Sequence, residues 1–103
     1  MVYVTIDDDD KANTLITSLL EKKLVACVNK VKDGMYSSYK WDGKVILDES
    51  EKLLIMKTSE DRLDDLIATV KKEHPYDCPE CIAVPVVKGT QDYLNWVKQE
   101  TKE

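Results

Sequence analysis

The hydrophobic residues of this chain change their spacing several times, and the order of those changes limits the fold more than any other feature. Residues 1–6 form a short β-rich run that ends in four consecutive aspartates, which suit a helix N-terminus. Apolar residues then recur at the i, i+3, i+4, i+7 and i+8 positions of one helix face, namely Ala12, Leu15, Ile16, Leu19 and Leu20. From residue 24 the pattern is β-rich again. The beginning of the chain therefore predicts a strand, a helix and a second strand.

A long hairpin is predicted around the Asp42-Gly43 pair. Asp-Gly favours a type I′ turn, because both central residues of that turn take positive φ. Gly34 interrupts the chain before the extended run 35–41 that leads into the turn. Residues 52–58, KLLIMKT, then form a further strand, whose nearly continuous apolar character indicates burial on both faces.

The second half of the chain predicts a helix, a strand and a closing helix. Thr58 or Ser59 can cap the first of these helices, and Pro75 ends it, because the residue before a proline avoids the helical region. Its apolar stripe consists of Leu63, Leu66, Ile67 and Val70. Residues 81–87, CIAVPVV, are expected to form an edge or bulged strand, since Pro85 cannot donate a hydrogen bond to a ladder.

The predicted order is βαββαβ followed by a terminal helix, which is the ferredoxin-like arrangement of an α+β protein. The terminal helix starts near Thr90 and is expected to turn Tyr93, Leu94 and Val97 inward. Residues 1–103 have the size of a single domain. One sheet with both helices on the same face leaves its other face bare, and Tyr36, Tyr39 and Trp41 add more apolar area than a monomer exposes. We therefore expect an oligomer.

Charge and composition argue against several classes of function. The net charge is −5 and no clustered basic face appears, so nucleic acid is not an expected partner. No apolar run approaches the ~20 residues of a membrane span, and the chain begins without a leader pattern, so we expect a cytoplasmic protein with no membrane contact. Three cysteines without a secretory signal are expected to be thiols. No nucleophile–base series or phosphate-binding glycine loop indicates an enzyme.

The segment HPYDCPEC, residues 74–81, holds the only histidine and two of the three cysteines. Imidazole and thiolate suit copper(I) or zinc, and Pro79 favours a turn that would bring Cys78 and Cys81 within ~7 Å of each other. An extended segment would instead point the two thiols to opposite faces, and buried packing is common for free cysteine. The histidine at position 74 has a similar alternative, as a core or capping imidazole. The candidate metal ligands are His74, Cys27, Cys78 and Cys81.

Five collinear stretches resemble the CutA divalent-cation tolerance family. They are LLEKKLVACVN, the Ser37-x-Tyr39-x-Trp41-x-Gly43 hairpin, Glu51 with LLIMKT, HPYD-x-PE at 74–80, and YLNWV at 93–97. The resemblance covers almost the whole chain, from about Val2 to Val97. It implies a homotrimer of ferredoxin-like subunits, similar in architecture to PII signalling proteins, and a link to tolerance of copper and other divalent cations.

The resemblance also implies that certain residues line a cleft between neighbouring subunits. The candidate ligand-binding residues are Lys57, Glu51, Trp41, Tyr39 and Tyr76, with Cys27 and His74 beside them. Trp41 and Tyr39 have an alternative role as interface core. Glu51 and Lys57 lie about 20 Å apart in an extended strand, so they need other partners, either in structural ion pairs or around a ligand. The family generally carries apolar residues where Cys78 and Cys81 stand, so the Cys-x-x-Cys belongs to this sequence.

These observations give one main functional hypothesis and two alternatives. The main hypothesis is a non-catalytic trimer that binds copper or another divalent cation and requires no cofactor. The first alternative is a PII-like sensor of a small anionic ligand, with Lys57 as the charge anchor. The second is a trimeric anchoring scaffold, a role linked to some members of the family.

Overall fold

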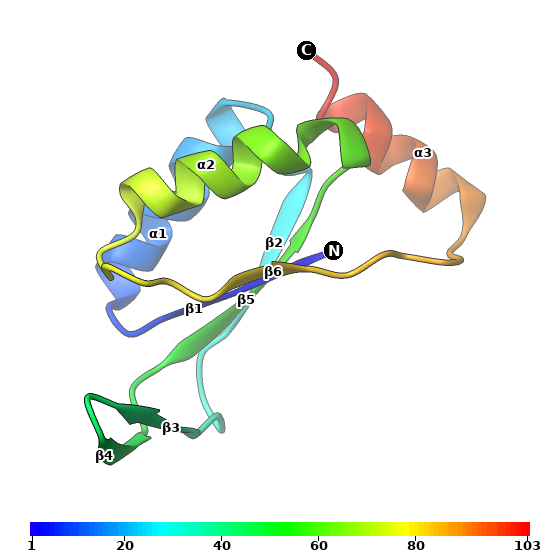
Figure 1. The fold of residues 1–103 in the computed structure, drawn as a ribbon. Helices are drawn as coiled ribbons and strands as arrows, with labels where there is room; N and C mark the ends of the chain where they lie inside the picture. The colour runs from blue at the N-terminus through cyan, green and yellow to red at the C-terminus, as the bar shows by residue number, and fades with distance from the viewer.

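The chain packs two helices on one face of an antiparallel sheet, as the computed structural model of residues 1–103 shows (Figure 1). Its elements are β1 (Val2–Ile6), α1 (Asp9–Glu21), β2 (Cys27–Val31), β3 (Ser37–Trp41), β4 (Lys44–Asp48), β5 (Lys52–Lys57), a 3-10 turn (Glu60–Arg62), α2 (Leu63–Glu73), β6 (Cys81–Ala83) and α3 (Gln91–Glu100). The main sheet has the order β2-β5-β1-β6, and β3 pairs with β4 in a separate hairpin. This is the predicted ferredoxin-like fold, with the hairpin inserted between β2 and β5.

The hydrophobic core lies between the sheet and the helices α1 and α2. Its largest contributors from the sheet are Val2, Val4, Ile6, Leu54 and Met56, and the helices add Ala12, Leu15, Leu19, Leu66 and Val70. Alternate residues of a strand face opposite sides, so the residues between these face away from the helices. Leu20 and Ile67 were predicted on the helix stripes but are exposed, because each helix touches the sheet along a narrower line than the sequence pattern suggests.

The ends of the helices explain why they start and stop where they do. Asp8 caps α1, and its carboxylate accepts a hydrogen bond from the Lys11 backbone N–H at 3.0 Å. The predicted side-chain cap of α2 is wrong: the Thr58 hydroxyl donates to the Leu24 carbonyl instead, and the Ser59 hydroxyl pairs with Thr101. The helix ends at residue 73, before the proline, as predicted.

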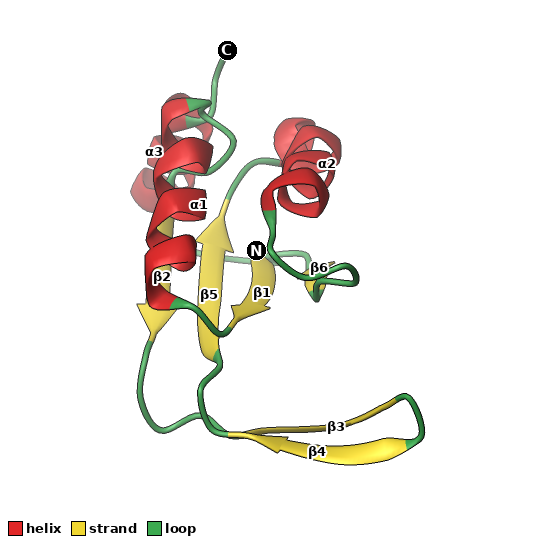
Figure 2. Cartoon of the chain, turned by 90° about the vertical axis from the view of Figure 1, so that its left-hand side faces the viewer, coloured by secondary structure: helices red, strands yellow, loops and turns green.

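The hairpin of β3 and β4 projects away from the main sheet (Figure 2). Asp42 and Gly43 have φ values of 55° and 77°, which confirms the predicted type I′ turn. The register pairs Tyr39 with Ile46 and Lys40 with Val45, so apolar side chains lie on both faces of the ribbon. An isolated two-stranded hairpin is marginally stable at best in water. Within one chain, these apolar faces remain uncovered.

The end of the chain differs from the sequence prediction. The strand predicted over 81–87 covers only Cys81–Ala83, although it lies at the sheet edge as expected. Beyond it, the Val84 N–H donates to the Met1 carbonyl at 2.8 Å and the Met1 amino group donates to the Val84 carbonyl at 3.0 Å. In α3 only Val97 is buried, and Tyr93, predicted to face inward, is 42 % exposed. None of the helices has the length and apolarity that a bilayer span requires.

Candidate functional site

One group of predicted residues meets at the start of β2, on the open sheet face, which is the face away from α1 and α2. Cys27 is paired in register with Lys57 of β5, and paired residues share a face. The next pair in the register, Val28 and Met56, faces the core. Cys27 and Lys57 therefore point to the open side.

Two further side chains complete this group. The Tyr93 hydroxyl, from α3, lies 3.2 Å from Cys27 Sγ, and the Lys57 ammonium donates to the Asn29 amide oxygen. Together, Cys27, Lys57, Asn29 and Tyr93 form the β2-edge cluster. The Tyr93 ring also rests against Trp96, with ring centroids 5.6 Å apart.

The β2-edge cluster presents a sulfur donor beside a cation. The hydrogen bond between the Tyr93 hydroxyl and Cys27, together with burial, raises the pKa of Tyr93, so its phenol stays protonated. Lys57 forms no salt bridge with any carboxylate of the chain. The cluster can therefore offer a soft ligand to a metal ion or a positive charge to an anion.

A second group lies where the hairpin joins β5. The Tyr76 hydroxyl donates to Glu51 Oε2 at 3.0 Å, and Glu51 is only 6 % exposed. The backbone N–H of Tyr76 donates to Nδ1 of His74 at 3.1 Å, and Nε2 of His74 lies 2.7 Å from the Thr5 carbonyl oxygen. The His74 and Tyr76 rings meet edge to face, with centroids 4.6 Å apart. Glu51, His74 and Tyr76 form the hairpin-base cluster.

The hairpin-base cluster has a structural role, because its polar groups bind one another and the backbone. Because Nδ1 of His74 accepts a hydrogen bond, the ring proton sits on Nε2 and is donated to Thr5, which leaves no free nitrogen lone pair. This agrees with the core or capping alternative for His74. Desolvation, followed by the bond to Glu51, raises the pKa of Tyr76 well above its usual range, so the phenol remains a donor. Lys57 lies at the far end of β5 from Glu51 and does not pair with it, as the spacing predicted.

The four candidate metal ligands are not gathered in one chain. Cys27 lies on β2 and Cys81 on β6, at opposite edges of the main sheet. Cys81 is in register with buried Val4 and packs against the core, and burial raises the pKa of its thiol. Cys78 is exposed on the loop before β6. No group of three or more His, Cys, Asp or Glu side chains is placed to hold a metal ion.

The aromatic candidates of the hairpin belong to neither cluster. Trp41 is 55 % exposed, and Tyr39 is exposed beside it on β3. Partial desolvation and the charge of Asp48 raise the pKa of Tyr39. Both side chains are therefore available to a ligand or to another subunit.

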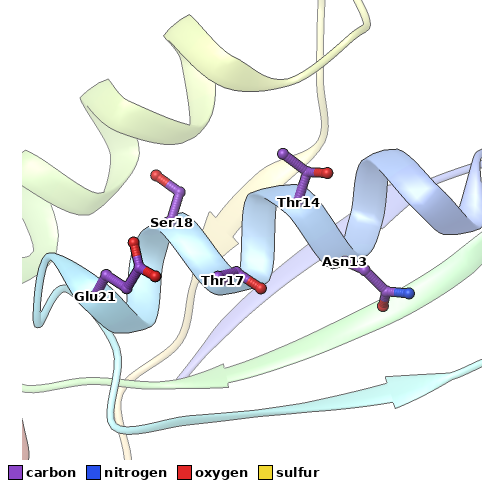
Figure 3. A pocket seen from close by; sticks show the side chains of 5 residues that line it. All are labelled: Asn13, Thr14, Thr17, Ser18 and Glu21. Atoms are coloured by element: carbon purple, nitrogen blue, oxygen red, sulfur yellow. The ribbon is translucent and has the colours of Figure 1, made fainter.

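Two of the hollows on the surface were not anticipated from the sequence. Figure 3 shows the first, of about 440 Å³, lined by polar side chains of α1 alone: Asn13, Thr14, Thr17, Ser18 and Glu21. The second, of about 590 Å³, lies between α3, the segment after β6 and the start of α2, with apolar walls that include Leu63, Val84, Leu94 and Val97. Neither hollow contains a residue of the two clusters.

Sequence reasoning also missed two members of the β2-edge cluster, Asn29 and Tyr93. A signal existed for Asn29, since it lies two residues after Cys27 in a strand and shares its face. Nothing in the spacing relates Tyr93 to Cys27, because 66 positions separate them and the contact depends on how α3 docks.

The fold and the two clusters define a ferredoxin-like α+β protein with a projecting hairpin and the hydrogen-bonded hairpin-base cluster where that hairpin joins β5. The family model described as CutA1 divalent ion tolerance protein matches residues 1–100. The chain therefore belongs to the CutA1 family, and the resemblance inferred from the sequence is confirmed.

Individual relatives agree with this assignment. "Protein CutA 1, chloroplastic" of Oryza sativa is 47% identical over 103 residues, which are 100% of this chain and 57% of that protein. The chain thus spans little more than half of that plant relative. The divalent-cation tolerance protein CutA of Thermus thermophilus is 39% identical over 98% of this chain and 96% of its own length. The crystal structure of CutA1 from Oryza sativa superposes with a TM-score of 0.91 at 47% identity, covering 99% of this chain and 92% of that one.

Proposed function

We propose that this chain is the subunit of a homotrimer that contributes to divalent-cation tolerance by binding copper without catalysis. The observation that carries the proposal is the Cys27 thiol, a soft donor on the open sheet face of a protein whose relatives are named for cation tolerance. The metal site would be completed across a boundary between subunits, since one chain groups too few donors.

The unpaired apolar surface supports assembly. A row of side chains in register, Ile55, Tyr3 and Ile82, crosses the open sheet face. The hairpin adds Trp41 on one of its faces and Leu47, which is 76 % exposed, on the other. Apolar surface on both faces of a projecting ribbon is costly in water and favours burial against neighbouring subunits.

The donor chemistry supports copper rather than magnesium or calcium. Thiolate is a soft ligand that selects copper(I), whereas the hard cations require several oxygen ligands together. His74 has both ring nitrogens engaged and Cys81 packs on the core. Cys78 is exposed on a loop, whereas Cys27 lies on the open sheet face that neighbouring subunits would cover, so Cys27 is the preferred donor of the four predicted residues.

A copper(I) titration of the fully reduced protein, in competition with a chelator and without oxygen, tests this proposal. We expect stoichiometric uptake, binding stronger than that of magnesium or calcium, and weaker binding as the pH falls, because protons compete for the thiolate. The Cys27→Ser variant should lose most of the binding, and the matched Cys78→Ser/Cys81→Ser variant should keep it. Absence of stoichiometric uptake by the reduced wild type would refute the metal function.

A second candidate function, sensing of a small anion, is favoured by Lys57. Its ammonium group lies on the open sheet face without a carboxylate partner, and Asn29 alone orients it. A thermal-shift panel of small anionic metabolites tests this candidate. An anion that stabilises the wild type and the hairpin control Lys40→Met, but not Lys57→Met, would support it, and a panel without any such anion would reject it.

We propose the cytoplasm as the compartment of this role. No helix of the chain could cross a membrane, although the rice relative is named chloroplastic. Fractionation of cells that produce the tagged full-length protein tests the proposal, and recovery in an organelle or the periplasm would overturn it.

A further inference from the structure

The pair Cys78 and Cys81 remains unexplained by either function. Both thiols are free, and the third cysteine lies at the opposite edge of the main sheet, where it contacts Tyr93. Cys78 is exposed, whereas Cys81 is half-buried against the core. Only two residues, Pro79 and Glu80, separate the pair, so each thiol is the nearest possible cysteine partner of the other along the chain.

The backbone around the pair lies mostly outside regular secondary structure. Residues 74–80 form no helix or strand, and Cys81 is the first residue of the three-residue edge strand β6. A four-residue turn brings its end Cα atoms within about 7 Å, and a disulfide needs them roughly 4.4–6.8 Å apart. Proline is favoured at the second position of such a turn, which Pro79 occupies.

The segment is nevertheless held in place at both ends. Tyr76 is bound to Glu51, and the Lys71 ammonium donates to the Asp77 carbonyl at 2.5 Å. At the other end, Cys81 is in register with Val4 of β1. These anchors confine both cysteines to one short segment. Residues 79 and 80 form no turn in the reduced chain, so closing a disulfide requires this segment to adopt the turn that Pro79 favours.

We propose that Cys78 and Cys81 are a dithiol redox site that exchanges with low-molecular-weight disulfides. The exposed Cys78 thiolate attacks one sulfur of the small disulfide, forms a mixed disulfide and releases one small thiolate. Cys81, after losing its proton to water, attacks the Cys78 sulfur and releases the second small thiolate. The protein loses two electrons and two protons, and the small disulfide is reduced to two thiols.

The order of the two attacks follows from exposure. Cys78 can be reached from solvent, whereas Cys81 must leave its packing against the core to resolve the mixed disulfide. Oxidation should therefore loosen the β1–β6 edge at the Val4–Cys81 pair. The site does not depend on copper binding or on anion binding.

The test equilibrates the reduced full-length protein with mixtures of reduced and oxidised glutathione, blocks the remaining thiols by alkylation and measures intact and peptide masses. We expect one alkyl group on the protein instead of three, a mass lower by two hydrogen atoms once that alkyl group is subtracted, one disulfide linkage between positions 78 and 81, and full reversal by dithiothreitol. In the Cys27→Ser variant, which the copper proposal expects to lose metal binding, the same disulfide between positions 78 and 81 should form, and crosslinks through position 27 are excluded. Cys81→Ser should stop at a glutathione adduct on Cys78, and Cys78→Ser should form no internal disulfide.

Three results would overturn the proposal. The first is a wild-type protein that stays fully reduced in mixtures that oxidise ordinary vicinal dithiols, and the second is a stable glutathione adduct on Cys78 without closure. The third is a disulfide that involves Cys27. Amide hydrogen exchange provides a second measurement, since oxidation should speed exchange in β6 and leave the β2–β5 ladder unchanged. Unchanged exchange in β6 would contradict the withdrawal of Cys81 from the core.

Discussion

Glu51 is a buried carboxylate whose only side-chain partner is the phenol of Tyr76. Burial of an ionised group without hydrogen bonds is costly, so the position of this carboxylate depends on a residue 25 places later in the chain. Tyr76 lies two residues after His74, and the His74 ring connects this loop to β1 through its hydrogen bond with the Thr5 carbonyl. One hydrogen bond therefore links the base of the hairpin to the loop that carries the cysteine pair.

Replacing Tyr76 with Phe should lower the free energy of unfolding by about 1–3 kcal/mol, because it leaves the buried Glu51 carboxylate without its donor. Urea denaturation at a fixed protein concentration measures the change. The matched control is Tyr36→Phe, since Tyr36 is 71 % exposed and its hydroxyl has no partner in the chain. Equal stabilities of the two variants would contradict the structural role of the Tyr76–Glu51 bond.

At the scale of single residues, sequence reasoning found chemical types but not contacts. Glu51, His74 and Tyr76 were candidates, yet no spacing showed that they meet each other rather than a ligand. The metal hypothesis for His74 relied on its residue type, whereas the structure uses both of its nitrogens for backbone groups. Side-chain partners depend on tertiary packing, which a local pattern does not encode.

Among the elements, α1 illustrates how local chemistry sets a boundary. Of the four consecutive aspartates, Asp7 and Asp8 precede the helix and Asp9 and Asp10 begin it, and only Asp8 accepts the Lys11 N–H with its carboxylate. Asp9 lies in the first turn and also pairs with Lys30 of β2, which lowers the pKa of Asp9 and ties the helix to the sheet. Neighbouring identical residues therefore have different roles.

The Asp8→Ala variant should lose about 0.5–2 kcal/mol of stability, because the cap satisfies a backbone donor that is otherwise free. The matched control is Asp7→Ala, which removes a carboxylate of the same charge, one position earlier, without removing the cap. Both variants are compared by urea denaturation in moderate salt, which screens the general charge effect. If Asp7→Ala costs as much as Asp8→Ala, the helix N-terminus depends on net charge rather than on capping.

The position of an element was predicted correctly where it depends on neighbouring residues, and the length of an element was not where it depends on pairing with a distant strand. The Asp42-Gly43 turn was correct because its signal lies in two adjacent residues. The last strand was predicted four residues too long, because its length depends on β1, its only neighbour. The ladder ends where Val84 meets Met1 and Pro85 offers no further donor.

For the whole molecule, the main feature left unexplained by one chain is the uncovered apolar surface on the open sheet face and on both sides of the hairpin. The helices cover one face only, and α3 buries a single residue of its own, so the chain contains nothing that covers the rest. The sequence predicted this imbalance from the order of the elements and the aromatic residues near the turn. A second and a third copy of the chain, as the homotrimer proposal requires, would bury these surfaces together.

The purified protein should therefore have the mass of a trimer in light scattering, and it should remain a trimer on dilution to micromolar concentration. The Trp41→Ala variant should weaken assembly by ~2 kcal/mol or more, because a large aromatic residue near the centre of an interface commonly contributes that much. Lys72→Ala, a change on the exposed side of α2 and away from the hairpin and the open sheet face, is the control and should assemble like the wild type. A monomer mass for the wild type would end the trimer proposal, whereas a fully stable Trp41→Ala trimer would leave this indole free to stack on a bound ligand.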